Sequence, residues 1–106
     1  MPSPSRRTQI NEQQAAKFGM LYPLIRAAHD DMVELSKKKP DAPVNETKVK
    51  LINRLLSEAA EILLADPIAA YVDVLDEETL PTNSDAVLIL GQFLQAMHQF
   101  EYRHLR

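Results

Sequence analysis

The spacing of apolar residues predicts α-helices along most of the chain and no β-strand. Between residues 18 and 35, and again between residues 49 and 63, apolar side chains recur at alternating steps of three and four. This spacing places them on one face of an α-helix, as in a helical bundle. They are Phe18, Leu21, Ile25, Ala28, Met32 and Leu35 in the first segment, and Val49, Ile52, Leu56, Ala59 and Leu63 in the second.

Prolines and capping residues indicate where these helices begin and end. Pro23 lies inside the first apolar pattern, where it removes one backbone donor, so we expect a kink there. Three lysines followed by Pro40 predict the end of the first helix. The connector over residues 40–44 is short enough to join antiparallel neighbours. Asn45 is a suitable N-cap for the second helix.

A short third helix is predicted directly after the second. Asp66 and Pro67 combine an N-cap residue with a proline at the first helical position. The apolar residues that follow have the spacing of one helical face and are Ile68, Tyr71, Val72 and Leu75. We expect this helix to end in the acidic residues that come next.

The last predicted helix, about residues 85–104, is the most apolar of the chain. Its main seam is Ala86, Leu90, Phe93, Met97 and Phe100, and no residue between Ala86 and Phe100 carries a formal charge. A helix that is apolar around most of its circumference should be buried on more than one side. Since a small domain offers few covering elements, a second copy could complete the burial. The pattern predicts an interface at Leu90, Phe93, Leu94, Met97 and Phe100.

Together these elements predict an all-α fold. It is a small antiparallel helical bundle of three long helices, the first kinked near Pro23, and one short helix. Residues 1–9 are rich in proline, serine and arginine and are expected to form a disordered N-terminal arm. Residues 10–106 are expected to form a single bundle domain, because 106 residues are enough for one domain at most.

The amino-acid composition limits the kinds of site and the cellular location that we expect for the protein. The chain has no cysteine, which excludes disulfides, thiolate catalysis and zinc sites built from cysteine. No apolar run approaches the ~20 residues that a membrane-spanning helix needs, and no secretory signal is recognisable. We therefore expect a cytoplasmic protein of bacterial or phage type, with no membrane partner.

The search for chemistry predicts no catalytic residue, no metal and no cofactor. Only two glycines are present, so a glycine-rich phosphate loop is excluded, and no two histidines have zinc-helix spacing. Arg26, His29 and Asp30 form one compact polar group that an enzyme could use. The simpler interpretation is a solvent-exposed i,i+4 pair between Arg26 and Asp30. His98, three residues before Glu101, is interpreted as a polar interface residue.

Charge is distributed unevenly and leaves two nucleic-acid alternatives open. Residues 1–54 carry 10 Lys or Arg against 6 Asp or Glu, whereas residues 55–102 carry nine acids and no base. A basic end could contact nucleic acid through Arg6, Arg7, Lys37, Lys38 and Lys39. The acidic segment 66–85 could instead imitate nucleic acid, with a patch at Asp73, Asp76, Glu77 and Glu78.

The function that the sequence favours is protein–protein interaction, as a homodimer or as an accessory or regulatory subunit. This hypothesis depends on the apolar last helix, because its circumference must be covered. Nucleic-acid binding or mimicry is the alternative, although the net charge of −3 does not favour a dedicated nucleic-acid binder.

Overall fold

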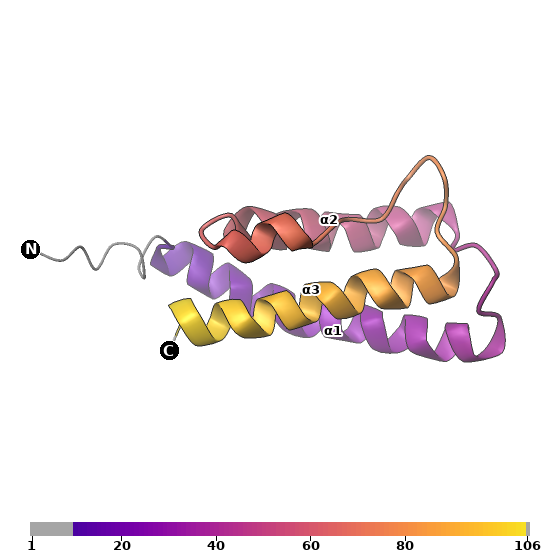
Figure 1. The fold of residues 1–106 in the computed structure, drawn as a ribbon, viewed down its shortest axis with the longest axis horizontal. Helices are drawn as coiled ribbons and strands as arrows, with labels where there is room; N and C mark the ends of the chain where they lie inside the picture. The colour runs from indigo at the N-terminus through magenta and orange to yellow at the C-terminus, as the bar shows by residue number, and fades with distance from the viewer. Residues whose placement is uncertain (1–9, 106) are drawn as a thin grey trace, which may run out of the picture.

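The structure, a computed structural model that describes residues 10–105, is a bundle of helices (Figure 1). It contains α1 (Glu12–Lys38), α2 (Glu46–Leu63), the 3₁₀ helix η2 (Pro67–Tyr71) and α3 (Asn83–His104). The predicted all-α class is therefore confirmed. The directions of the helices differ from the expected antiparallel arrangement, because α1 runs opposite to α2 and α3 whereas α2 and α3 run the same way.

Side chains cap the N-terminus of each long helix. The Asn11 side chain accepts from the Gln14 backbone at 2.8 Å, and the Gln14 side chain accepts from the Asn11 backbone, which makes a capping box on α1. Asn45 caps α2 as predicted, and Thr82 accepts from the Asp85 backbone at the start of α3. These contacts satisfy backbone N–H groups that have no partner inside the helix.

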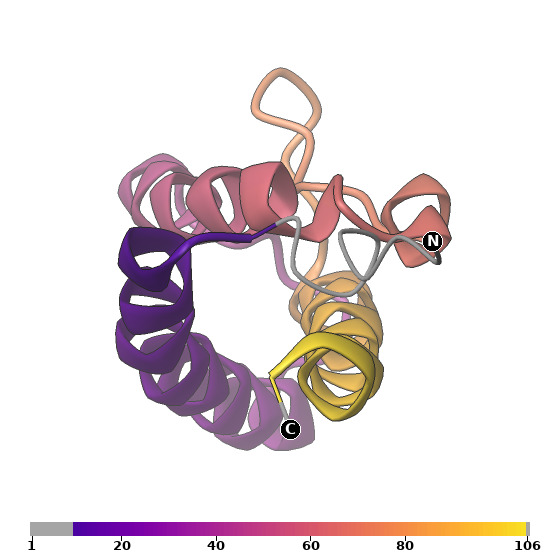
Figure 2. The same ribbon diagram turned by 90° about the vertical axis from the view of Figure 1, so that its left-hand side faces the viewer.

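Helix α1 continues through Pro23 without a break. Figure 2 views the bundle end-on and shows α1 following a curved path, with α2 and α3 on different sides of it. This course lets one helix contact both of the others along its length. The contact between α1 and α3 is the most extensive in the described chain.

The predicted short helix is wrong beyond its first turn. Asp66 does cap it, with its side chain accepting from the Ile68 backbone, but the 3₁₀ helix ends at Tyr71 and the backbone is extended at Val72. A distant contact explains the change. The buried Asn53 amide on α2 donates to the Leu75 carbonyl oxygen at 2.7 Å and accepts from the Leu75 N–H at 2.8 Å. A helix over 68–75 would use the Leu75 N–H in its own hydrogen bond, so that the Asn53 side chain could not accept from it.

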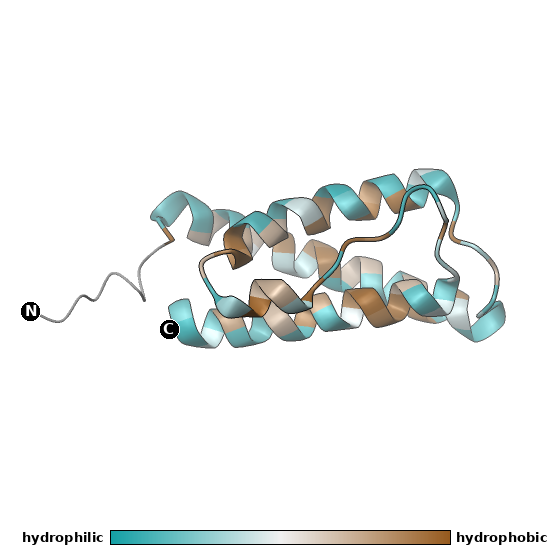
Figure 3. Cartoon of the chain, turned by 45° about the horizontal axis from the view of Figure 1, so that its top comes forward, coloured by the Kyte–Doolittle hydropathy of each residue, from teal (hydrophilic) through white to brown (hydrophobic). Residues whose placement is uncertain are grey.

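The segment after η2 then returns along α2 before α3 begins. Figure 3 shows it changing from hydrophobic to hydrophilic as it leaves the bundle surface. Backbone hydrogen bonds join its end to the α1–α2 connector, from Val44 N to Pro81 O at 2.8 Å and from Asn83 N to Ala42 O at 2.9 Å. The Asn83 side chain also donates to the Lys39 carbonyl oxygen. This return segment is why α2 and α3 point the same way.

All three long helices contribute to one hydrophobic core. Inside it the rings of Phe18 and Phe100 stack with their centroids 5.6 Å apart. The return segment adds Leu75, and the connector adds Val44. The largest fully buried side chains are Phe18, Phe93, Phe100, Ile25, Met32, Leu56, Leu63, Leu75, Leu90, Met97, Val44 and Val49.

Candidate functional site

The predicted interface on α3 is largely the core of the single chain, which corrects the sequence-based assignment. Leu90, Phe93, Met97 and Phe100 each have 0% exposed surface, and Leu94 is half-buried. The reason is geometric: α1 and α2 lie on two sides of α3, and η2 lies against it as well. The main apolar seam of α3 is therefore covered without a partner, whereas Leu88 on the same helix stays 61% exposed.

Part of the apolar surface that stays exposed lies between α1 and α2. A groove of about 350 Å³ runs between these helices, and we call it the apolar groove. Leu24 on α1 is 52% exposed and Leu51 on α2 is 57% exposed. The groove is lined by Leu24, Ala27, Ala28, Asp31, Met32, Lys48, Leu51, Ile52 and Leu55.

A second and chemically different groove lies between α1 and α3. This polar groove has a volume of about 490 Å³ and adjoins another hollow of about 510 Å³. The two hollows share Tyr22, Arg26 and His98, so they form one surface feature along the α1–α3 contact. The polar groove is lined by Tyr22, Arg26, His29, Asp30, Gly91, Leu94, Gln95 and His98.

The polar groove brings together two groups that are about 70 residues apart in sequence. Arg26 lies over the Tyr22 ring, with its guanidinium carbon 4.9 Å from the ring centroid. His29 Nδ1 is 3.5 Å from a carboxylate oxygen of Asp30, on the exposed side of the ring. On the α3 side Gly91 lies next to His29, since a Cβ at Gly91 would be in ordinary contact with His29 Nε2, at 3.7 Å. The fold thus joins the Arg26–His29–Asp30 group to His98.

The predicted basic end is described only in part. Lys37, Lys38 and Lys39 are exposed at the end of α1. Lys37 forms an ion pair with Glu34 at 3.0 Å, and the Lys39 backbone joins the Asn83 contact. Arg6 and Arg7, like the whole predicted disordered arm, lie outside the described residues.

The predicted acidic patch lies in the return segment, where two of its members hold the local backbone. Asp73, Asp76, Glu77 and Glu78 are all exposed. The Asp76 carboxylate accepts from the backbone N–H groups of Glu78 and Thr79, and these hydrogen bonds lower its pKa. Glu77 accepts from Asn53 at 3.0 Å. The Asp76 contacts are of the kind that turn-forming segments use, and the Glu77 contact joins the segment to α2.

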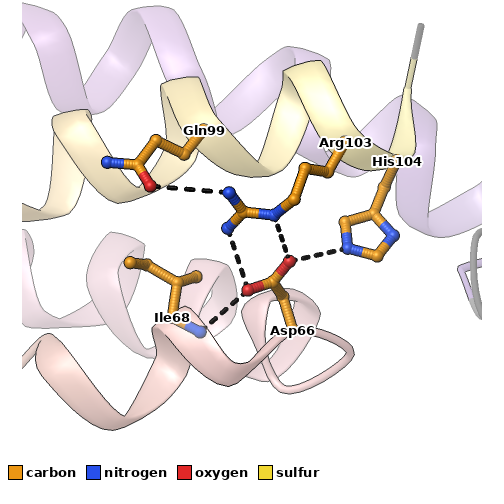
Figure 4. Close-up of polar contacts among 5 residues, drawn as sticks. All are labelled: Asp66, Ile68, Gln99, Arg103 and His104. Carbon is orange, nitrogen blue, oxygen red and sulfur yellow. Dashed lines mark hydrogen bonds and ion pairs between the residues drawn. The ribbon is translucent and has the colours of Figure 1, made fainter.

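A partly buried ion-pair network joins the end of α3 to the start of η2, and we call it the C-terminal latch (Figure 4). Arg103 donates to both Asp66 oxygens, from Nε at 2.7 Å and from Nη2 at 2.9 Å. His104 Nε2 lies 2.9 Å from the same carboxylate, which also accepts from the Ile68 backbone at 2.8 Å. This geometry is the bidentate pairing that arginine makes with a carboxylate.

The electrostatics of the latch are those of a structural site. The Arg103 guanidinium, followed by the Ile68 N–H and His104, holds the pKa of the Asp66 carboxyl well below its usual range against the opposing effect of burial. The same pair raises the pKa of Arg103. His104 is 8% exposed, stacks on Phe100 at 4.4 Å and leaves its Nδ1 atom without a hydrogen-bond partner in the described chain. Because the carboxylate is enclosed by its partners, the latch fixes η2 against α3.

Metal binding and membrane insertion find no support in residues 10–105. That range holds no group of three or more His, Asp or Glu arranged to hold a metal ion. It also holds no helix with the length and apolar character to cross a bilayer.

Comparison of the chain with protein-family models, with curated proteins and with solved structures finds no match.

Sequence reasoning missed the apolar groove and underrated the polar one. A signal for the first was present, since Met20, Leu24 and Ala27 repeat the three-and-four spacing beside the main seam of α1. No local signal could join Arg26 to His98, because only the packing of α1 on α3 places them together. No local signal gave a role to Arg103 or His104 either, because only the fold brings them to Asp66.

Proposed function

We propose that the protein acts through protein–protein contact, as a homodimer that forms at the apolar groove. The observation that carries the proposal is the exposure of Leu24 and Leu51 on facing walls of one groove. Exposed apolar surface that is contiguous across two helices is typical of contact sites, whereas scattered single residues are normal. Met20, which is 63% exposed and four residues before Leu24, extends the same face along α1.

The floor and walls of the groove suit another helix. Ala27 and Ala28 are small, so a helix can approach α1 closely between the leucines. Residues 20, 24 and 27 recur at steps of four and three, which is the spacing of helices that pack side by side in bundles. An α1–α2 face from each of two copies would then form a four-helix arrangement.

The charges at the groove favour a second copy as the occupant. A symmetric dimer places the same surface on both sides, so that surface must complement itself. The groove carries one acid, Asp31, and one base, Lys48, and neither makes an ion pair within residues 10–105. A surface with one charge of each sign does not repel its copy, and Lys48 of one protomer can pair with Asp31 of its partner.

Sedimentation velocity of the full chain tests the proposal. The wild type is expected to sediment at micromolar concentration as a species of twice the chain mass of 12.0 kDa. Leu51→Glu should return it to the monomer, because a charge would be buried in the contact. Leu88→Glu is the matched control, since Leu88 is 61% exposed on α3 and lies outside the groove.

Two results would overturn the homodimer. One is a wild-type monomer at every concentration tested, which would leave the groove to a helix of a different protein. The other is an equal loss of mass in Leu51→Glu and Leu88→Glu, which would show that the contact does not depend on this groove. Far-ultraviolet circular dichroism of both variants confirms that each retains its helices.

A further inference from the structure

The polar groove differs from the apolar groove because five of its eight lining residues carry side-chain hydrogen-bond donors. Arg26 supplies a guanidinium, Tyr22 a hydroxyl, Gln95 an amide, and His29 and His98 two imidazoles. These side chains come from both walls, α1 and α3, and converge on one hollow of about 490 Å³. A concave surface with a few convergent polar groups is the usual form of a small-ligand site.

The principal donor of this groove is available for a ligand. Arg26 has no carboxylate partner within residues 10–105. Arg103, in contrast, donates to both carboxylate oxygens of Asp66. The Tyr22 ring supports the Arg26 guanidinium from one side, which limits its freedom and leaves its N–H groups unpaired. His98 also makes no hydrogen bond or ion pair within the described residues.

The two carboxylates near the groove do not occupy the donors. The Asp30 side chain is 73% exposed and lies against His29 Nδ1, at 3.5 Å, so it is directed away from the Nε2 side of the ring. Glu101 lines the adjoining hollow together with Arg26 and His98, but it makes no hydrogen bond or ion pair with either of them within residues 10–105. The Arg26–His29–His98 side of the groove is therefore the donor-rich part.

We propose that the polar groove binds a phosphate group, held between the Arg26 guanidinium and the imidazoles of His29 and His98. The planar fork of arginine matches two phosphate oxygens, and the ring N–H groups can donate to the others. The chemistry is shared by inorganic phosphate and by phosphate monoesters. This site lies between α1 and α3 and is independent of the homodimer at the α1–α2 groove.

The three histidines of the chain provide a direct test in the full-length protein. The ¹H–¹³C correlations of their imidazole rings report on each site separately by NMR. On titration with inorganic phosphate at constant pH and ionic strength, the His29 and His98 signals should shift together and saturate. His104 is 8% exposed in the C-terminal latch and serves as the internal control, so its signal should stay in place.

Substitutions of Arg26 separate a bound phosphate from a general salt effect. Arg26→Gln should weaken the apparent phosphate affinity at least about tenfold, because the charged fork is lost. Arg26→Lys should give an intermediate affinity, since it keeps the charge without the fork. Arg54→Gln is the matched control: Arg54 is exposed on α2 and lies in neither groove.

A second ligand distinguishes the two sources of phosphate. Adenosine 5′-monophosphate that binds more tightly than inorganic phosphate, with shifts reaching Tyr22, identifies a monoester site, and equal affinities identify a site for the free ion. The proposal is overturned if neither ligand shifts His29 and His98, if all three histidines shift alike, or if Arg26→Gln titrates as Arg54→Gln does.

Discussion

Helix α3 and the α1–α2 pair show opposite relations between the apolar character of the sequence and the exposure of apolar side chains. α3 has the more apolar sequence, yet its seam residues Leu90 and Phe93 have no exposed surface. α1 and α2 carry many charges, yet Leu24 and Leu51 are more than half exposed. The comparison teaches that the most apolar helix is the one whose seam is buried within the bundle. A contact surface is marked by apolar side chains that the neighbouring helices leave uncovered.

The largest effect is expected from a substitution in the covered helix. Phe93→Ala should lower the free energy of unfolding by about 3–5 kcal/mol, because it removes a fully buried ring and leaves a cavity. Urea denaturation monitored by circular dichroism measures the change. Leu88→Ala on the exposed side of the same helix should change stability by no more than about 0.5 kcal/mol. If Phe93→Ala instead dissociated a dimer while leaving stability intact, α3 would be the interface after all.

A smaller loss is expected where the return segment covers α2. Asn53→Ala removes the side chain that pairs with both backbone groups of Leu75, which is itself buried. The unpaired N–H and C=O should cost about 1–3 kcal/mol of stability. Hydrogen exchange of the Leu75 amide is the specific measurement, and it should accelerate more than the amides of α1. Unchanged protection at Leu75 would show that Asn53 does not hold the segment.

The C-terminal latch predicts how the end of α3 responds to pH. The folded protein holds the pKa of Asp66 below the value of about 3.9 that an unfolded chain has. Its contribution to stability is therefore complete well above that value and is lost progressively as the pH falls through it towards the lower pKa of the folded state. Asp66→Asn should be less stable than the wild type at pH 7, with the difference shrinking towards pH 3.

Urea titrations at several pH values measure this dependence, and Arg103→Gln tests the same pair from the other side. The double variant should lose less than the sum of the two single losses, because both remove one interaction. A strictly additive double variant, or a difference that grows on acidification, would contradict the assigned role of the pair.

The smallest change in stability is expected at the apolar groove. Leu24→Ser alters a side chain that is 52% exposed, so the free energy of unfolding of the monomer should change by no more than about 0.5 kcal/mol. The measurement is made at a dilution where the wild type is also monomeric. Dimer formation in sedimentation should nevertheless weaken, which separates a contact residue from a core residue. A large loss of monomer stability would instead show that Leu24 acts as a core residue, as Phe93 does.

Local signals were sufficient for most of the helices. The apolar repeats located α1, α2 and α3, and the predicted caps Asn45 and Asp66 are confirmed together with Thr82, one of the residues that lead into α3. These features depend on neighbours within one or two turns, which a sequence pattern contains. The basic and acidic alternatives for nucleic acid stay predictions, because no contact in the structure bears on them.

Features that depend on distant residues were not predictable in the same way. The short helix was wrong after Tyr71 because Asn53 captures the backbone of Leu75 from 22 residues away. The parallel course of α2 and α3 follows from that return segment. The polar groove requires the packing of α1 on α3, and the interface was assigned to residues that the same packing buries.

The positions of the helix ends make the chain a candidate for circular permutation. The start of α1 and the end of α3 lie at the same end of the bundle, whereas the hydrophilic turn at Asp76 projects near the opposite end. A short peptide could therefore join the end of α3 to the start of α1, and new termini could be opened after Glu78 without cutting a helix. In such a permuted protein α3 would be the first helix to be synthesised. A reporter fused to a new terminus would lie away from the latch.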